Sequence, residues 1–259
     1  MQALVTNDDG VHSEGLLALA RIARARGLEV TVVAPSFDAS GSSASMTATA
    51  SDGKVLVDTV TRAGGPQVLG VQGPPAFIVR AAMYGAFGPP PDVVLSGINR
   101  GPNTGRAVLH SGTVGAALTA SNYGRRGLAI SAGIDEDDGC DPDPGIVAAA
   151  VDWILRAPGA AVLNVNVPGD SRERGGTAVM VTSLADAGMV QGSVSEVTGG
   201  MVPVTFADAG TKPEAGTDSA ALSEGLVSVT AIRAVTENRD LDVGALLRSA
   251  TGRLDAGPA

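Results

Sequence analysis

Short apolar runs alternate with helical patterns through the first two thirds of the chain. The runs are rich in β-branched and other apolar side chains, as in buried strands, and comprise residues 3–6, 29–34, 92–95, 128–131 and 161–167. Apolar residues at helical spacing lie between them, in residues 14–26, 76–87, 113–123 and 146–156. Strands that alternate with helices are typical of a parallel sheet with crossover helices. We therefore predict an α/β fold with a Rossmann-like three-layer sheet.

The pattern changes after residue 168. Gly, Ser and Thr become frequent, and strand candidates remain at residues 179–182, 202–206 and 226–232. We divide the chain into an α/β core (1–168), a β-rich extension that completes the same domain (169–232), and a C-terminal helix and tail (233–259). The extension has too few helices to cover both faces of its strands. We therefore expect a C-terminal β-hairpin that serves in oligomerisation, in a homodimer or homotetramer.

Composition limits the partners of the protein. Of its 259 residues 44% are apolar, which is enough to bury the core of one large domain. The formal net charge of -9 gives no sequence-wide positive field for a DNA or RNA backbone, so we expect no polymeric nucleic acid partner. A small phosphorylated substrate remains compatible with an acidic protein when a cation or backbone N–H groups supply positive charge locally.

Cysteine usage and the N-terminus indicate the compartment. Cys140 is the only cysteine, which excludes an internal disulfide and a cysteine-rich zinc cluster. The sequence starts with an apolar strand and a charged turn, without the basic start and long apolar core of a signal peptide. No apolar stretch approaches the length that spans a membrane. We expect a cytoplasmic protein without a membrane partner.

Loops at the carboxyl ends of parallel strands are where open α/β sheets bind ligands. The first such loop contains the adjacent carboxylates of Asp8 and Asp9. Two carboxylates this close raise each other's pKa unless a cation neutralises them, so the pair indicates a divalent metal site. The alternative is a turn in which an aspartate caps the following helix.

Two further loops offer neutral oxygen ligands. Residues 36–47 contain a run of serines and glycine that begins at Ser40, and residues 96–105 contain Asn99 and Asn103. Hydroxyl and amide oxygens can complete the coordination shell of a hard cation. Each loop also has a plainer interpretation, as a flexible polar loop in the first case and as left-handed Asn and Gly turns in the second.

The fourth loop, Ser111-Gly112-Thr113, opens a helix. The free N–H groups and the positive dipole end at a helix start favour an anion such as phosphate. Ser111 could instead act only as an N-cap. The two histidines, His12 and His110, lie beside these loops, and either could donate a proton to a leaving alkoxide.

The available side chains limit which metal the site could bind and which class of enzyme the protein could be. Without a cysteine cluster or paired histidines on a helix, they are hard oxygens that suit Mg²⁺, Mn²⁺ or Ca²⁺ rather than zinc. The sequence has neither the nucleophile elbow of a serine hydrolase nor a dinucleotide-binding glycine motif after the first strand. Adjacent aspartates also favour metal binding over Asp8 as a nucleophile, because haloacid-dehalogenase enzymes place their two aspartates two residues apart.

Four segments, in order, resemble signatures of the SurE family of survival-protein nucleotidases: VTNDDG, SGSSASMT, SGINRGPN and HSGTVGAA. The resemblance continues at residues 164–168, 216–218 and 227–230, and so spans most of the chain. It implies a SurE-like fold, exchange of an arm between subunits, and hydrolysis of nucleoside monophosphates or related small phosphate esters by a 5′/3′-nucleotidase.

The resemblance also implies roles for single residues. The metal ligands would be Asp8, Asp9, Ser40 and Asn99, and the phosphate-contacting or substrate-binding residues would be Asn103, Ser111, Gly112 and Thr113. We expect one Mg²⁺ or Mn²⁺ per subunit, or Ca²⁺ in a crystal, which polarises the phosphoryl group and lowers the pKa of a water. Asp8, Asp9 and Asn99 are then the catalytic set, and residues 111–113 stabilise charge on the phosphoryl oxygens.

Departures from the family pattern surround these residues. Phe77 stands in place of a carboxylate, Arg106 and Ala107 in place of an acidic pair, and His110 in place of a tyrosine. From Phe77 we expect an apolar pocket wall and a selectivity that favours aromatic esters such as p-nitrophenyl phosphate. Two alternatives to a nucleotidase follow: a phosphatase for a specialised phosphorylated metabolite, and a weakly active scaffold that binds a phosphorylated ligand.

Overall fold

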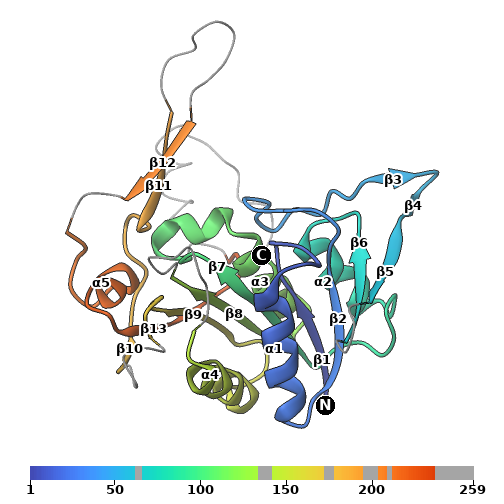
Figure 1. The fold of residues 1–259 in the computed structure, drawn as a ribbon, viewed down its shortest axis with the longest axis horizontal. Coiled ribbons are helices and arrows are strands. Elements are labelled where there is room, and N and C mark those ends of the chain that lie inside the picture. Colours follow the sequence, from blue (N-terminus) through green and yellow to red (C-terminus); the bar gives the residue numbers. More distant parts are fainter. Residues whose placement is uncertain (62–65, 134–141, 172–177, 195–203, 209–211, 237–259) are drawn as a thin grey trace, which may run out of the picture.

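A nine-stranded sheet runs through the protein in the order β10-β13-β9-β8-β7-β1-β2-β6-β5 (Figure 1). The computed structural model describes residues 1–61, 66–133, 142–171, 178–194, 204–208 and 212–236. The strands of the large sheet are β1 (Gln2–Thr6), β2 (Glu29–Pro35), β5 (Val57–Thr61), β6 (Gln67–Val71), β7 (Val93–Arg100), β8 (Arg126–Ala132), β9 (Val162–Val167), β10 (Val179–Val181) and β13 (Val227–Ile232). Two small sheets pair β3 (Ala50–Ser51) with β4 (Lys54–Val55) and β11 (Val190–Val194) with β12 (Val204–Asp208).

The middle of the sheet is parallel, as the sequence predicts. β2, β1, β7, β8 and β9 are parallel neighbours, and Leu4 of β1 is in register with Thr31 of β2 and Val94 of β7. The helices are α1 (Glu14–Ala25), α2 (Pro75–Met83), η1 (Gly105–His110), α3 (Gly112–Asn122), α4 (Pro144–Arg156) and α5 (Asp218–Ser223). Because parallel strands end at the same edge, the loops after β1, β2 and β7 can meet there.

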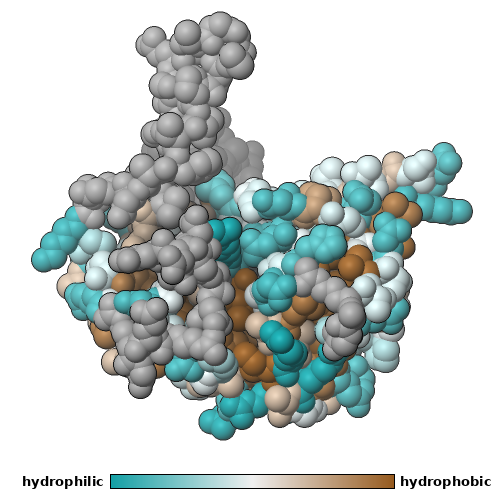
Figure 2. Space-filling view, in the orientation of Figure 1, coloured by the Kyte–Doolittle hydropathy of each residue, from teal (hydrophilic) through white to brown (hydrophobic). Residues whose placement is uncertain are grey.

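Helices cover both faces of the sheet. Side chains alternate between the faces along β1, so that Leu4 packs in a hydrophobic cluster with α2 and α3, whereas Ala3 and Val5 pack in a second cluster with α1 and α4. Figure 1 shows α1 and α4 on the same side of the sheet, and Figure 2 shows hydrophobic surface between them. The predicted three-layer α/β fold is confirmed. None of the helices in the described part of the chain is long and apolar enough to cross a bilayer.

Some elements differ from the sequence prediction. The helix expected at residues 76–87 ends at Met83, because the chain turns at Gly85, whose φ is 81°. The strand expected at residues 92–95 continues to Arg100, with an irregular register against β8 after Ser96. The sequence pattern does not predict β5 and β6, since β5 is a largely exposed edge strand without a buried apolar face.

The C-terminal third extends the sheet and also projects from it. β13 lies antiparallel to β9, and β10 lies parallel to β13, so two strands of the expected extension belong to the main sheet. The antiparallel pair of β11 and β12 projects away from the sheet (Figure 1). Its use in a homodimer or homotetramer stays a prediction. Most of the predicted C-terminal segment, residues 237–259, lies outside the described residues.

Candidate active site

A cavity of about 290 Å³ lies at the carboxyl ends of β1 and β7, beside the start of α3. The residues that line it are Asp8, Ser40, Gly41, Asn99, Arg100, Pro102, Asn103, Thr104, Ala107, His110, Ser111, Gly188 and Met189. The structure thus brings together the four loops that the sequence singles out. Asp9 directly follows the lining residue Asp8, and Gly112 and Thr113 are the two residues after the lining residue Ser111, but none of the three lines the cavity itself.

The carboxylate of Asp8 is buried and held by the start of α3. The hydroxyl of Thr113 donates to one oxygen of Asp8 at 2.5 Å, and the backbone N–H of Thr113 donates to the other at 3.1 Å. Burial raises the pKa of Asp8, and these hydrogen bonds oppose the rise. Thr113, expected to contact phosphate, therefore positions Asp8 in this structure.

Gly112 allows α3 to come this close to Asp8. A Cβ atom at this position would lie 2.8 Å from Oδ2 of Asp8 and 2.7 Å from the hydroxyl oxygen of Ser42. Any side chain would push the helix start away from the carboxylate. The predicted site residue Gly112 thus has a steric role that is visible in the packing.

Asp9 completes a pair of crowded carboxylates. Burial, followed by the charge of Asp8, raises the pKa of Asp9 to about 7, although a backbone hydrogen bond from Arg100 lowers it. Its Oδ2 atom is buried and has no hydrogen-bond partner among the residues that the structure describes. A buried carboxylate oxygen in this state gains most from a bound cation.

Asn99 and Ser40 add neutral oxygens beside this pair. The amide nitrogen of Asn99 donates to the carbonyl of Gly101 at 2.8 Å, which orients its amide oxygen toward the hydroxyl of Thr113 at 3.4 Å. The hydroxyl of Ser40 donates to Asp38 at 2.6 Å, so its lone pairs remain available as a ligand. Both side chains line the same cavity as Asp8.

The four predicted metal ligands fit a hard divalent cation. Asp8 and Asp9 supply negative charge, and Asn99 and Ser40 supply neutral oxygens, which is the ligand chemistry of Mg²⁺ and Mn²⁺. Within the described part of the chain, no group of three or more His, Cys, Asp and Glu side chains is arranged to hold a metal. A cation at this cavity therefore depends on the neutral oxygens as well as on the two carboxylates.

Backbone contacts hold the serine loop against the neighbouring loops. The N–H of Ala39 donates to the carbonyl of Asp8 at 2.8 Å, and the N–H of Ser43 donates to the carbonyl of His110 at 3.1 Å. The hydroxyl of Ser43 adds a bond of 2.5 Å to the carbonyl of Leu109. The segment that presents Ser40 is thus fixed at both ends rather than flexible.

The polar groups at the start of α3 are mostly hydrogen-bonded to other groups of the protein. The hydroxyl of Ser111 accepts a bond from the N–H of Val114 at 3.1 Å, so Ser111 is an N-cap, and its own N–H donates to Val108. The N–H of Thr113 is used by Asp8. The positive end of the helix therefore faces Asp8, and Ser111 faces the cavity with a hydroxyl proton that the cap does not use.

Asn103 is held by two asparagines of β9. Its N–H donates to Oδ1 of Asn166 at 2.8 Å, and its carbonyl accepts from the amides of Asn164 at 2.9 Å and Asn166 at 3.0 Å. Its side-chain nitrogen donates to the hydroxyl of Ser131 at 2.8 Å. The polar positions of an otherwise apolar strand thus fix a residue of the cavity wall.

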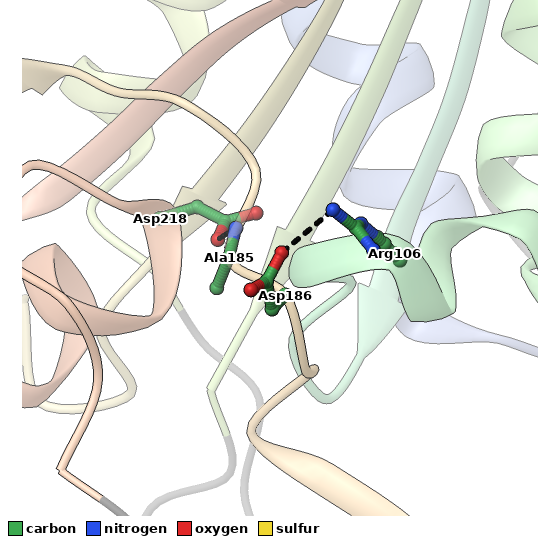
Figure 3. A network of polar contacts seen from close by, with 4 residues as sticks. All are labelled: Arg106, Ala185, Asp186 and Asp218. Carbon is green, nitrogen blue, oxygen red and sulfur yellow. Dashed lines mark hydrogen bonds and ion pairs between the residues drawn. The ribbon is translucent and has the colours of Figure 1, made fainter.

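Two of the surrounding substitutions, Phe77 and Arg106, are not among the described residues that line the cavity. Phe77 packs with the hydrophobic cluster of α2, Leu4 and Val71, and is not one of the described residues that line the cavity. The expected apolar pocket wall at Phe77 is not found at this cavity, because this partly buried side chain packs against the hydrophobic cluster instead. Arg106 points to Asp186 at 2.7 Å, with both side chains exposed, and does not line the cavity either (Figure 3).

Of the two candidate proton donors, His110 lines the cavity, whereas His12 does not.

The sequence does not predict every residue of the cavity wall. Gly188 and Met189 come from the connection between β10 and β11, far along the chain from the predicted loops. No local pattern marks these two residues, because long-range contacts bring them to the cavity.

Comparison with known proteins agrees with this geometry. The model of the family described as Survival protein SurE matches residues 3–190. The chain belongs to the SurE family. The matched segment contains all eight predicted site residues and also Met189.

Individual SurE proteins match over about two thirds of the chain or over nearly all of it. A 5′-nucleotidase SurE of Herpetosiphon aurantiacus is 37% identical over 257 residues, covering 93% of this chain and 95% of the relative. A 5′-nucleotidase SurE of Xanthomonas axonopodis pv. citri is 38% identical over 173 residues, 65% of this chain and 64% of that protein. The crystal structure of the SurE protein from Aquifex aeolicus superposes with a TM-score of 0.75 at 27% identity, covering 95% of this chain and 100% of that one. The family resemblance of the motifs and the predicted fold are both confirmed.

Proposed function

We propose that the protein is a divalent-metal-dependent phosphomonoesterase that hydrolyses nucleoside monophosphates, a 5′/3′-nucleotidase. The observation that carries this proposal is the adjacent pair of Asp8, which is buried and lines the cavity, and Asp9, whose buried Oδ2 atom has no hydrogen-bond partner among the described residues. The name 5′-nucleotidase SurE of its relatives supports nucleotides as the substrate class. The reaction is the hydrolysis of a phosphoric monoester.

The metal would be held by Asp8, Asp9, Ser40 and Asn99, and Mg²⁺ or Mn²⁺ suits these oxygens. When bound, such an ion supplies positive charge to a phosphoryl group and acidifies a water.

The chain's own residues hold the site in place. Thr113 fixes both oxygens of Asp8, and Gly101 fixes the amide of Asn99, so little reorganisation is needed on binding. The hydroxyl of Ser111 would donate a hydrogen bond to a phosphoryl oxygen. His110 is assigned to the leaving alkoxide, since it is the histidine of the cavity wall.

Chelation tests the proposal directly. Phosphate release from AMP is expected to stop in excess chelator and to return on addition of Mg²⁺ or Mn²⁺, because the bound ion would supply the positive charge that polarises the phosphoryl group and acidifies a water. Circular dichroism in chelator serves as the control that the fold persists. Full turnover in excess chelator would contradict the proposal.

The two alternative functions have little support in the cavity. Of the substitutions Phe77, Arg106 and His110 that motivate them, only His110 lines the cavity. A panel of phosphate esters that includes p-nitrophenyl phosphate, AMP and GMP distinguishes a nucleotidase from a phosphatase for another metabolite. Binding without turnover of any ester would favour the scaffold.

A further inference from the structure

Part of the cavity wall comes from the connection between β10 and β11. Here Gly188 and Met189 join lining residues that otherwise belong to the first half of the chain. Met189 is the largest apolar side chain of the described cavity wall. A flexible, polarisable thioether makes favourable contacts with an aromatic ring such as a nucleobase.

A buried carboxylate holds the segment that carries Met189. Asp218, at the start of α5, is fully buried and does not line the cavity. Its Oδ1 accepts a hydrogen bond from the N–H of Ala185 at 2.9 Å, and its Oδ2 accepts one from the N–H of Gly105 at 2.8 Å. Figure 3 shows Asp218 facing Ala185, next to the Arg106 and Asp186 pair. One side chain thus joins the segment of Met189 to the first residue of η1.

Further hydrogen bonds and a close backbone contact hold the same two segments together. The N–H of Arg106 donates to the carbonyl of Ala185 at 3.0 Å, and the N–H of Met189 donates to the hydroxyl of Thr104 at 3.0 Å. A Cβ atom on Gly105 would lie only 2.5 Å from the carbonyl of Ala187, so the backbones are in direct contact. The exposed ion pair of Arg106 and Asp186 adds little to this attachment.

We propose that Met189 is a specificity-determining residue that contacts the nucleobase of the substrate, and that Asp218 is a positioning residue that sets the place of Met189. This inference rests on the proposed function. The predicted metal ligands Asp8, Asn99 and Ser40 line the same cavity as Met189, so a substrate whose phosphate lies at these oxygens can present its base to the apolar side chain of Met189. Asp218 does not contact the substrate itself and acts only by holding the backbone of the segment that carries Met189.

The test compares two substrates that differ only in the base. The ratio of kcat/KM for AMP to kcat/KM for ribose 5-phosphate is measured with Mn²⁺. Met189→Ala is expected to lower this ratio about tenfold, since one apolar contact to the base is lost. Asp218→Asn is expected to lower it in the same direction, because the amide turns a donor toward a backbone N–H. The double variant should fall no lower than Met189→Ala, since Asp218 acts through Met189.

Two further variants separate positioning from stability. Asp186→Asn, on the same segment, breaks only the exposed ion pair and should leave the ratio unchanged. Thr104→Val removes the acceptor of the Met189 N–H and should lower the ratio even if Asp218→Asn does not fold.

The outcomes distinguish the inference from the proposed function. An active wild type whose ratio is unchanged by Met189→Ala overturns the inference alone. An equal loss for both substrates in Asp218→Asn and Thr104→Val, with a lower Tm, overturns the positioning role of Asp218. A wild type that hydrolyses neither ester overturns the proposed function and the inference with it.

Discussion

The cavity has two parts that are built in different ways. The strand-loop part, with Asp8, Asn99 and Ser111, consists of residues that directly follow β1, end β7 or start α3. The C-terminal part, with Gly188 and Met189, reaches the cavity through hydrogen bonds to Thr104 and Asp218 rather than through its place in the sheet. The difference teaches that the groups proposed for chemistry are placed by neighbouring strands, whereas the wall proposed for recognition is placed by contacts that are distant in sequence.

The largest expected effect is at Asp8 in the strand-loop part. Asp8→Asn should lower kcat/KM for AMP by about a thousandfold or more, since a charged ligand of the expected metal is lost. The fold should persist, because removing one of two crowded buried carboxylates relieves repulsion with Asp9. Steady-state kinetics and thermal unfolding measure the two effects. An Asp8→Asn enzyme with wild-type activity would place the metal elsewhere.

A smaller loss is expected from Gly112→Ala. The added methyl would meet Asp8 and Ser42 at less than van der Waals distance, so the helix start must shift away from the carboxylate. We expect kcat/KM for AMP to fall about a hundredfold, as for other small misplacements of catalytic groups. Gly145→Ala in the first turn of α4 is the matched control, since its methyl would meet only the side chain of Asp143. Equal activity of the two variants would show that the close approach at Gly112 is not needed.

The strand-loop part also predicts a pH dependence of metal binding. The pKa of Asp9 is about 7, and a carboxylate must lose its proton to bind a metal. The rise in Tm on adding Mn²⁺ should therefore be larger at pH 8 than at pH 6, with the apparent affinity changing about tenfold per pH unit below 7. Differential scanning calorimetry at both pH values measures it, and Asp9→Asn is the control that should flatten the profile. An equal rise at both pH values would contradict the role of Asp9.

In the metal-free protein, the contribution of Asp9 to folding stability decreases as the pH rises, which is opposite to the pH dependence of metal binding. Its pKa is higher in the folded protein than the usual value of 3.8, so the folded state binds the proton more tightly than the unfolded state. The resulting stabilisation is fully present below the unfolded pKa and is lost as the pH rises through about 7. The metal-free protein should therefore lose stability from this group over the range in which metal binding strengthens.

The smallest effect is expected at the exposed edge of the C-terminal part. Arg106→Ala removes the ion pair with Asp186, whose side chains are 78% and 83% exposed. The free energy of unfolding should change by no more than about 1 kcal/mol, and kcat/KM for AMP by no more than about twofold. Urea denaturation and kinetics test both numbers. A large loss of activity would mean that Arg106 contacts the substrate rather than only Asp186.

The sequence predicts the strand-loop part far better than the C-terminal part. Asp8, Ser40 and Asn99 each lie in a polar loop next to a predicted strand, so the parallel order of the strands is enough to bring them together. The sequence does not predict Met189 as a residue of the cavity, because its position depends on a hydrogen bond to Thr104 and on Asp218. Asp218 lies more than 20 residues after Met189 in the chain. β5 escapes notice because an exposed edge strand needs no apolar alternation.

The wrong expectation for Phe77 has a different cause. A substitution within a family motif shows that the chemistry of a position has changed, but not which way its side chain points. α2 packs Ile78 and Val79 on the sheet, and the ring of Phe77 contacts the same cluster. Only the packed helix shows that this partly buried side chain lies against the hydrophobic cluster and does not line the cavity.

The attachment of the serine loop has a consequence for the entropy of binding. Ala39 and Ser43 form hydrogen bonds to Asp8, Leu109 and His110 within the folded protein. Ordering a flexible loop costs roughly 1–2 kcal/mol per residue, and here that loss has already occurred on folding. Ligand affinity at Ser40 therefore need not include the cost of closing a mobile loop, and little additional heat capacity change from loop ordering should accompany binding.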